Sequence, residues 1–377
     1  MKLLLVSNYF NHHQKPFCEE LNRRPDVTFS FIATGVMRQE RKQLGYAQND
    51  RPAYVLETYE DEEQRQRAIR MINAADVVIA GAAPEEMLAE RLQAGKLIFR
   101  YSERPFKKKV SPARWAYHAV RFRRRDRGDR NVWLLCAGAY AAEDFAGMGL
   151  YRERMLRWGY FPEVKDYDAE QLLARKKQNT ILWCGRFLDW KHPDDAIEVA
   201  RRLRDSGYDF HLNMIGTGTM EAELKQTVER YDLAGCIHFL GSMPPEQVRF
   251  YMEEAGILLM TSDRQEGWGA VLNEAMNSAC AVTASDGVGS ASFLIRDGEN
   301  GRVYPSMNTA ALYDLVCALL RDPAAQKRLG AQAYRTVHTL WNHRVAADRL
   351  VQLSNRLLAG DTDLGLFAEG PGSLIRI

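Results

Sequence analysis

Two glutamates, Glu266 and Glu274, stand eight residues apart shortly after the apolar run Ile257–Met260. The pattern predicts a strand, a loop with two glycines that holds Glu266, and a helix from about Gly269 that carries Glu274. A strand-to-helix turn at the carboxyl end of a parallel sheet is where α/β proteins bind ligands, and the N–H groups at such a helix start favour a phosphate. Both carboxylates can point into one cleft there and accept hydrogen bonds from sugar or ribose hydroxyls.

Two cations, Arg186 and Lys191, follow another apolar run, Thr180–Cys184, and stand five residues apart. Arginine offers a planar fork of donors and lysine a point charge, so the two can converge on one diphosphate. Alone, such a pair is common among ordinary surface charges. The pair stands eighty residues before the first glutamate.

A third loop, Met214–Met220, contains Gly216 and Gly218 and follows the apolar run His211–Ile215. A dinucleotide-binding turn needs a third glycine three residues later, where this chain has Glu221, so the loop does not predict an NAD site. The acids Asp189 and Asp263 show no Asp-x-Asp spacing. We therefore expect neither a metal ion nor a cofactor.

These loops need a scaffold, and apolar runs alternate with helical patterns along nearly the whole chain. Stretches of 3.6-residue spacing, such as Asp195–Asp205 and Met220–Tyr231, predict helices between the runs. The alternation predicts an α/β protein with parallel sheets that are covered on both faces. The expected strands are Leu3–Val6, Phe29–Ala33, Val77–Ala80, Leu97–Phe99, Val132–Cys136, Thr180–Cys184, His211–Ile215, Ile237–Phe239, Ile257–Met260 and Ala281–Ala284.

The alternation breaks at about Tyr160–Pro162, before the polar segment Glu163–Asn179. The chain is long enough for two domains, and we place them at residues 1–163 and 164–340. Residues 341–377 contain an amphipathic pattern, Trp341–Leu358, that predicts a long helix. The glycine-rich tail Ala359–Ile377 that follows shows little patterning.

The motif Glu266-Gly267-Trp268-Gly269 with Glu274-Ala275-Met276 resembles that of the retaining glycosyltransferases of family 4, whose fold is GT-B: two Rossmann-like domains with parallel sheets facing an interdomain cleft. The resemblance implies that Glu266 binds hydroxyls of the donor sugar, that Glu274 binds the ribose, and that Arg186 and Lys191 neutralise the leaving diphosphate. The stretch Asn277–Val282 departs from the family's usual A-x-G-x-P-V and leaves the glutamates in place. By the same resemblance the donor site also includes Gly185, Gly216, Gly218, Leu240, Trp268, Gly269 and Ala270.

The resemblance covers residues 178–358 well and residues 1–165 only in architecture. It implies that the first domain holds the acceptor and that the helix after residue 341 crosses back to that domain. Acceptor-side candidates are Asn11, His12 and His13 in the first loop after a strand, and Glu103 after the run Leu97–Phe99. Histidine titrates near neutrality and can meet a phosphate or a hydroxyl; plain loop capping is the competing interpretation of the first loop.

A basic segment, Arg100–Arg130, contains twelve Lys or Arg and three acids, whereas the whole chain has a net charge of +2. It includes Lys107–Lys109 and Arg123–Arg125 and is interleaved with aromatic residues. A solvated helix face, an acidic soluble acceptor, a lipid-pyrophosphate acceptor and contact with an anionic membrane all fit this pattern. No nucleic-acid-binding motif accompanies it, so we expect no nucleic-acid partner.

We therefore expect a metal-independent, retaining hexosyltransferase that uses a nucleoside-diphosphate sugar, with UDP as the expected nucleotide. Its acceptor is a saccharide or lipid-linked saccharide of bacterial polysaccharide or glycoconjugate assembly. The alternatives are a GT-B sugar-nucleotide epimerase and a non-catalytic GT-B partner protein. The first apolar run is too short for a secretory signal, no run is long enough to span a membrane, and the six cysteines are scattered. These features indicate a cytoplasmic protein, with possible peripheral contact at the inner face of the plasma membrane.

Overall fold

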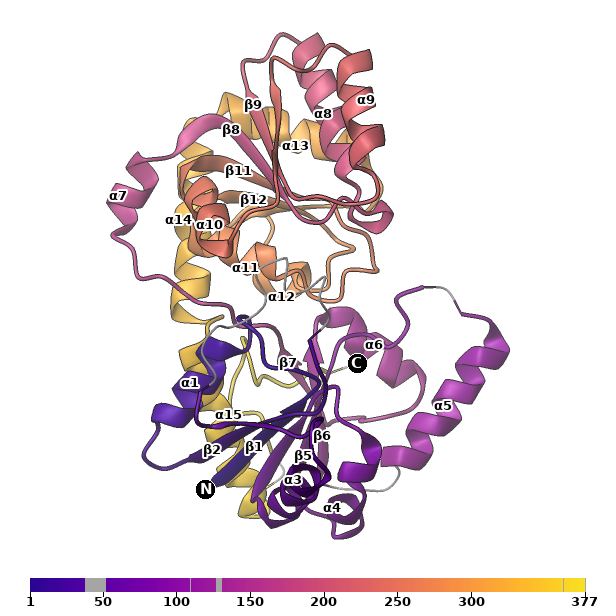
Figure 1. Cartoon of the computed structure of the whole chain (residues 1–377). Coiled ribbons are helices and arrows are strands. Elements are labelled where there is room, and N and C mark those ends of the chain that lie inside the picture. The colour runs from indigo at the N-terminus through magenta and orange to yellow at the C-terminus, as the bar shows by residue number, and fades with distance from the viewer. Residues whose placement is uncertain (38–51, 109, 127–130, 362, 377) are drawn as a thin grey trace. The chain divides into compact units, whose positions relative to one another are not determined.

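The computed structural model describes residues 1–37, 52–108, 110–126, 131–361 and 363–376. The chain divides into two compact units: unit 1 is Met1–Glu163 with Asn342–Ile377, and unit 2 is Val164–Trp341. The domain limits expected at residues 163 and 340 lie within one residue of these divisions. Each unit contains one parallel sheet with helices around it (Figure 1), so the predicted α/β class with two Rossmann-like domains is confirmed.

Unit 1 has a seven-stranded sheet in the order β3-β2-β1-β4-β5-β6-β7. Its inner strands, such as the wholly buried β4, are continuous apolar runs because helices cover both faces of the sheet. The strands are β1 (Lys2–Ser7), β2 (Thr28–Ala33), β3 (Val55–Glu57), β4 (Val77–Ala80), β5 (Ile98–Ser102), β6 (Val132–Ala137) and β7 (Met155–Trp158). The helices are α1 (Lys15–Arg23), α3 (Glu62–Ala74), η2 (Glu85–Met87), α4 (Ala89–Gln93), α5 (Pro112–Asp126), α6 (Ala139–Gly147) and α15 (His343–Leu358).

The C-terminal segment of the chain completes unit 1. Helix α15 packs on α1, and Arg24 just after α1 forms an ion pair with Asp348 of α15 at 3.2 Å. The tail after α15, whose sequence shows little patterning, pairs antiparallel with β7: Arg157 N donates to Ser373 O at 2.8 Å and Ile375 N donates to Met155 O at 2.9 Å. This backbone pairing satisfies the outer edge of the sheet and needs no long apolar run.

A buried arginine holds α3, α4 and β5 together within unit 1. The Arg91 side chain is fully buried, and its guanidinium donates to the backbone carbonyls of Ile72, Ala75, Asp76 and Leu97 at 2.7 to 3.2 Å. Burial lowers the pKa of Arg91 to about 10. The guanidinium therefore donates hydrogen bonds to carbonyls at the C-terminal end of α3, which have no partner within the helix.

Unit 2 has a six-stranded sheet in the order β10-β9-β8-β11-β12-β13. Its strands are β8 (Lys177–Cys184), β9 (His211–Ile215), β10 (Ile237–Gly241), β11 (Ala255–Met260), β12 (Ala281–Ser285) and β13 (Arg302–Tyr304). The helices are α7 (Ala169–Ala174), η3 (Asp189–Lys191), α8 (Pro193–Asp205), α9 (Glu221–Arg230), α10 (Pro245–Glu254), α11 (Ala270–Asn277), α12 (Ala291–Leu294), α13 (Thr309–Arg321) and α14 (Pro323–Thr339).

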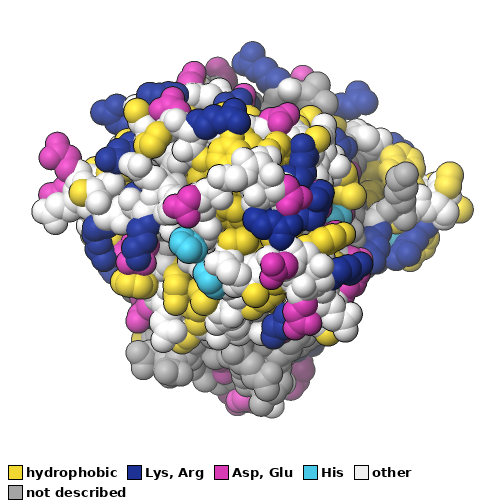
Figure 2. Space-filling model, turned by 90° about the horizontal axis from the view of Figure 1, so that it is seen from above, with side chains coloured by type: hydrophobic (Ala, Val, Ile, Leu, Met, Phe, Trp, Pro, Cys, Tyr) yellow, Lys and Arg dark blue, Asp and Glu magenta, His cyan; other side chains and the backbone are white. Residues whose placement is uncertain are grey.

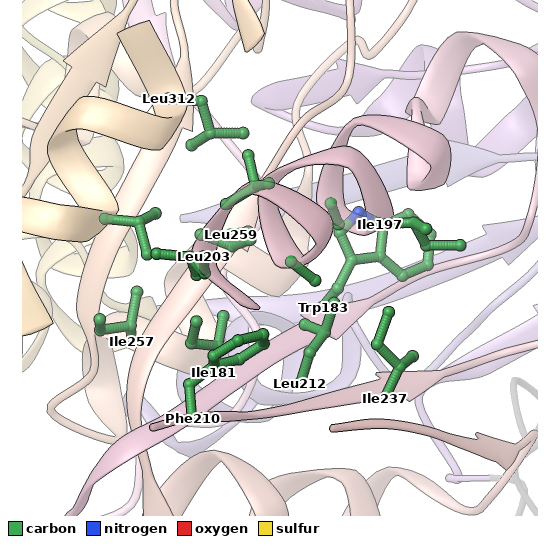
Figure 3. Packing of buried hydrophobic residues seen from close by; sticks show 14 of the residues in the cluster. Ile181, Trp183, Ile197, Leu203, Phe210, Leu212, Ile237, Ile257, Leu259 and Leu312 are labelled. Atoms are coloured by element: carbon green, nitrogen blue, oxygen red, sulfur yellow. The ribbon is translucent and has the colours of Figure 1, made fainter. Parts of the chain in front are cut away.

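The core of unit 2 fixes the strands that carry the candidate site. Ile181 and Trp183 of β8, Leu259 of β11 and Ile197 of α8 pack in one buried cluster, which Figure 3 shows from close by. Leu259 is paired with Trp183 in the sheet, so β8 and β11 end side by side. The loops that follow these two strands therefore emerge at one edge of the sheet.

Among the described residues, no helix combines the length and the hydrophobicity of a membrane-spanning segment.

Candidate active site

The loops after β8 and β9 are held together through their backbones. Gly185 N donates to Ile215 O at 3.0 Å, and Phe187 N donates to Thr217 O at 2.9 Å. A Cβ atom at Gly216 would lie 1.8 Å from the Gly185 carbonyl oxygen, and one at Gly218 would lie 2.3 Å from the Phe187 carbonyl oxygen. Both glycines are therefore required for the two loops to approach, whatever they contact in a ligand.

The loop after β11 is attached to the loop after β8 by a chain of hydrogen bonds. The Trp183 indole donates to Thr261 Oγ1 at 2.8 Å, and that hydroxyl donates to the Lys191 carbonyl at 2.6 Å. Asp263 N donates to the Trp190 carbonyl at 3.0 Å. These contacts fix the backbone of the segment that carries Lys191 relative to the segment that carries Glu266.

Lys191 and Glu266, predicted from separate motifs, form an ion pair. Lys191 Nζ contacts Glu266 Oε2, and the two side chains are only 13% and 12% exposed. The Ser262 hydroxyl donates to the same oxygen at 3.3 Å, and no described residue donates to Glu266 Oε1. One carboxylate oxygen of Glu266 is therefore left to accept a hydrogen bond from a ligand.

The Glu274 carboxyl lies near the end of β8. Burial raises its pKa, which the positive charge of Arg249 partly offsets. Burial also raises the pKa of the Cys184 thiol to about 12, and the negative charge of Glu274 contributes to that rise. The carboxyl accepts no hydrogen bond from any described residue, so Glu274 is a half-buried acceptor beside the Cys184–Gly185 turn.

The turn into α11 depends on Gly269. Its φ of +86° lies in the left-handed region, and a Cβ atom there would lie 2.5 Å from Met260 Cε. Ala270 is the first residue of the helix, and no described group accepts from the backbone N–H of Gly269 or Ala270. These N–H groups and the dipole of α11 favour a negative charge at this point.

The ring of Trp268, one of the predicted donor-site residues, is buried within unit 2. The Trp268 indole donates to Asn273 Oδ1 at 2.8 Å, and the ring lies 5.9 Å from that of Trp341. Only the backbone of Trp268 is available to a ligand. The ring instead supports the loop from inside unit 2.

Two further predicted donor residues, Arg186 and Leu240, lie at the same edge of the sheet. Arg186 is half-buried in the loop after β8. Leu240 is half-buried in β10, and the next residue, Gly241, accepts from Gly216 N at 2.8 Å through its carbonyl. The loop after β12 was not among the predicted site segments; a Cβ atom at Gly289 in this loop would lie 1.9 Å from the Gly267 carbonyl oxygen. The Gly287-Val288-Gly289 pattern was the signal for this close approach.

The acceptor-side candidates lie in unit 1, and Tyr160 links two of them. Tyr160 Oη donates to Glu103 Oε1 at 2.7 Å, and the Tyr160 ring stacks on that of His13 with centroids 6.4 Å apart. Lys107 Nζ contacts Glu103 Oε2 at 2.6 Å. His13, Tyr101 and Tyr160 line a small hollow, so the two predicted loops do meet.

The other two acceptor-side candidates have simpler surroundings. Asn11 Oδ1 accepts from the backbone N–H of His13 and Gln14 at 3.0 and 3.3 Å, so Asn11 caps the turn before α1. The His12 and His13 rings lie 3.9 Å apart. The loop-capping interpretation therefore accounts for Asn11, while His13 faces the hollow.

Comparison with known proteins agrees with the geometry of unit 2. Residues 164–336 match the family model of the group 1 glycosyl transferases. The amylovoran biosynthesis glycosyltransferase AmsK of Erwinia amylovora is 30% identical over 235 residues, which cover 60% of this chain and 57% of AmsK. The chain thus spans little more than half the length of the curated relatives it matches.

Solved structures extend the likeness to both units at the level of fold. Anabaena HepE, solved in complex with UDP, is 14% identical with a TM-score of 0.67, and the match covers 96% of this chain and 100% of HepE. TarM is 11% identical with a TM-score of 0.69 and matches over 94% of this chain and 98% of its own. The chain therefore has the two-Rossmann GT-B fold of these proteins, and its second unit matches the group 1 glycosyltransferase model.

Proposed function

We propose that the protein is a retaining glycosyltransferase of family 4 that moves a sugar from a nucleoside-diphosphate sugar to an acceptor hydroxyl. The observation that carries the proposal is the ion pair between Lys191 and Glu266 at the shared edge of β8 and β11, with Glu274 and the start of α11 at the same edge. A nucleotide sugar offers a diphosphate, which cations and the N–H groups at a helix start can bind, and hydroxyls, which carboxylates can accept hydrogen bonds from. This edge of the sheet presents all three kinds of group.

Each group has a role in this reaction. Negative charge builds on the diphosphate as the glycosyl bond breaks, and Arg186, Lys191 and the start of α11 stabilise that charge. Glu266 Oε1 accepts a hydrogen bond from a hydroxyl of the donor sugar, and the Glu274 carboxylate accepts one from a ribose hydroxyl. No metal is needed in this proposal, because the two cations supply the positive charge.

The relatives named above support our proposals for the nucleotide and for the pathway type. HepE was solved with UDP, which favours UDP as the nucleotide. AmsK is a glycosyltransferase of amylovoran biosynthesis, which favours a role in polysaccharide assembly. For this chain we propose the transfer of a hexosyl group to a saccharide or a lipid-linked saccharide. We propose a cytoplasmic location because nucleotide sugars are made in that compartment.

Nucleotide release tests the proposal. A thermal-shift screen with UDP, GDP and ADP identifies the nucleotide, and release from the matching sugar nucleotides is then measured with and without saccharide acceptors. We expect UDP to raise the melting temperature, release to depend on an acceptor, and the glycoside to keep the donor's anomeric configuration by NMR. A changed sugar nucleotide without a glycoside identifies an epimerase, and failure of every nucleotide to bind identifies a non-catalytic protein.

A further inference from the structure

Five of the nine described cations in the basic segment Arg100–Arg130 form ion pairs or hydrogen bonds within unit 1. Arg100 is 4% exposed and contacts both Asp126 and Glu85 at 2.9 Å. Arg104 pairs with Asp144 at 3.0 Å. These residues are unavailable to a partner, because their charges are already neutralised.

The three arginines of the triplet Arg123–Arg125, which belongs to the basic segment, have different surroundings in the fold. The Arg123 guanidinium donates to the Met148 carbonyl at 2.7 Å, and Arg125 pairs with Asp126 at 2.6 Å. Only Arg124 is exposed with no ion pair or hydrogen bond to a described residue. Lys109, Arg127 and Arg130 lie outside the described residues.

The cations that remain gather on helix α5. Arg114, Arg121 and Arg124 are exposed and form no ion pair with a described residue, and so is Lys108 just before the helix. Spacings of seven and three residues place the three arginines on one side of an α-helix. The sequence contains no Asp or Glu between Arg104 and Arg125, so nothing on α5 before its last residue offsets this charge.

Apolar side chains are exposed on the same helix. Tyr117 is 64% exposed, Val120 is 46% exposed and Trp115 is 36% exposed. Residues 111–117 are exposed on all sides of the helix, and Figure 1 shows α5 at the rim of unit 1, away from strands β1 and β2. At the right-hand edge of Figure 2, the edge at which α5 lies in Figure 1, dark blue and yellow side chains gather.

We propose that the exposed side of α5, formed by Arg114, Tyr117, Val120, Arg121 and Arg124, binds the surface of an anionic lipid bilayer. Arginines attract anionic headgroups and extend from the interface, while aromatic and aliphatic side chains enter the boundary between headgroups and acyl chains. The helix projects outward. Single-stranded nucleic acid would instead be bound along a groove in which bases stack on aromatic rings. Protein bound in this way lies on the membrane and does not span it.

Vesicle sedimentation of the full-length protein tests this surface without using its activity. The probes are vesicles of phosphatidylglycerol with phosphatidylcholine and vesicles of phosphatidylcholine alone. We expect binding to the anionic vesicles at low salt, weaker binding as salt rises, and none to the neutral vesicles. Binding to neither, or equally to both, overturns the proposal; so does retention by a polynucleotide with no vesicle binding.

Two variants with equal charge separate the surface from the total charge. Changing Arg114, Arg121 and Arg124 to Gln should lower the vesicle partition coefficient about a hundredfold, since each cation contributes about a factor of five. The matched control changes Lys2, Arg67 and Arg70, exposed cations of unit 1 outside α5, to Gln and should change it less than threefold. Equal losses in the two variants would show that net charge, and not α5, is responsible.

A tryptophan placed within the surface gives a second readout that does not depend on charge. Trp115 is exposed, but at about 100° per residue it lies on the side of α5 opposite to Tyr117 and Arg121. In a Trp115→Phe background, Tyr117→Trp should be quenched by anionic vesicles with brominated acyl chains. Absence of this quenching in protein that sediments with the vesicles would show that another part of the protein meets the bilayer and would contradict the proposal.

Discussion

The ion pair between Lys191 and Glu266 defines, at the scale of single residues, what a donor must displace. Each charge neutralises the other, and both side chains are mostly buried. A diphosphate that contacts Lys191 competes with a carboxylate for the same ammonium group. Hydroxyls of the bound sugar then donate to Glu266. Lys191 and Glu266 thus each replace their mutual contact by a contact with the donor.

Removing either cation should stop the reaction while leaving the fold intact. We expect Arg186→Ala and Lys191→Ala each to lower turnover about a hundredfold or more, because each removes charge stabilisation from the transition state. The matched control is Lys225→Ala, which removes an exposed lysine of α9 that pairs with Glu221 in the same unit. Turnover within threefold of wild type in both site variants would falsify the diphosphate assignment.

Glu274→Gln should make the protein more stable and its nucleotide binding weaker. Burial raises the pKa of the Glu274 carboxyl above its ordinary 4.5. As the pH rises past 4.5, this carboxyl therefore loses its proton in the unfolded state before it does so in the folded state. Stability therefore falls as pH rises from the unfolded pKa through the folded pKa. We expect the variant to melt above wild type at pH 7, and the difference to vanish below about pH 4.

Calorimetry at several pH values and UDP titration measure these two effects. Glu266→Gln is the comparison: it should lower turnover more than UDP affinity, because its proposed partner is the sugar. A Glu274→Gln protein that melts lower than wild type at pH 7 would contradict the burial argument. Equal losses of UDP affinity in the two variants would contradict the division of roles.

The sequence predicted the contacts of charged residues better than those of aromatic ones. Lys191 and Glu266 were placed in one site by the resemblance of their motifs to those of a known family, and they meet because β8 and β11 end side by side. The sequence did not indicate that the Trp268 ring is buried, because its buried neighbour Trp341 lies far along the chain. Tyr160, which joins Glu103 to His13, stood in a segment that carried no motif.

At the scale of elements, close contacts between loops position the site. We expect Gly289→Ala to destabilise the protein by about 1–3 kcal/mol, because its Cβ would overlap the Gly267 carbonyl beside Glu266. UDP affinity should fall with it. Gly235→Ala is the matched control, since a Cβ there meets nothing within 4 Å. Thermal unfolding of both variants checks this, and similar melting temperatures would contradict it.

Arg91 makes a corresponding prediction for unit 1. Arg91→Met leaves four buried carbonyls without their donor, and we expect it to lower the free energy of unfolding by at least about 3 kcal/mol. Arg67→Met, on the exposed side of α3, should stay within about 0.5 kcal/mol of wild type. Denaturant unfolding distinguishes the two, and a small loss in Arg91→Met would show that water satisfies these carbonyls.

All ten predicted strands are present, and the three that were missed share one feature. β3, β7 and β13 are short and include a charged residue, Glu57, Arg157 and Arg302. Each stands last in its sheet, where one side reaches solvent or the C-terminal tail, so a continuous apolar run is not needed. Central strands were predictable because burial on both faces demands such runs.

At the scale of the whole molecule, the two units differ in how much their sequence reveals. Unit 2 combines a match to a family model with a contact between Lys191 and Glu266, which belong to separate motifs. Unit 1 has the same architecture and no such motif, so its surfaces are known only from the structure. Its basic segment illustrates the point, because composition alone could not separate Arg100 and Arg104 in ion pairs from Arg114, Arg121 and Arg124 on α5.

A crystal structure of the full-length protein with UDP tests the central claim most directly. We predict that the diphosphate lies within hydrogen-bonding distance of Arg186 and Lys191, that the ribose hydroxyls contact Glu274, and that Lys191 no longer contacts Glu266 Oε2. UDP bound away from the loops after β8 and β11, or bound with the Lys191–Glu266 pair intact and Glu274 empty, would contradict the account.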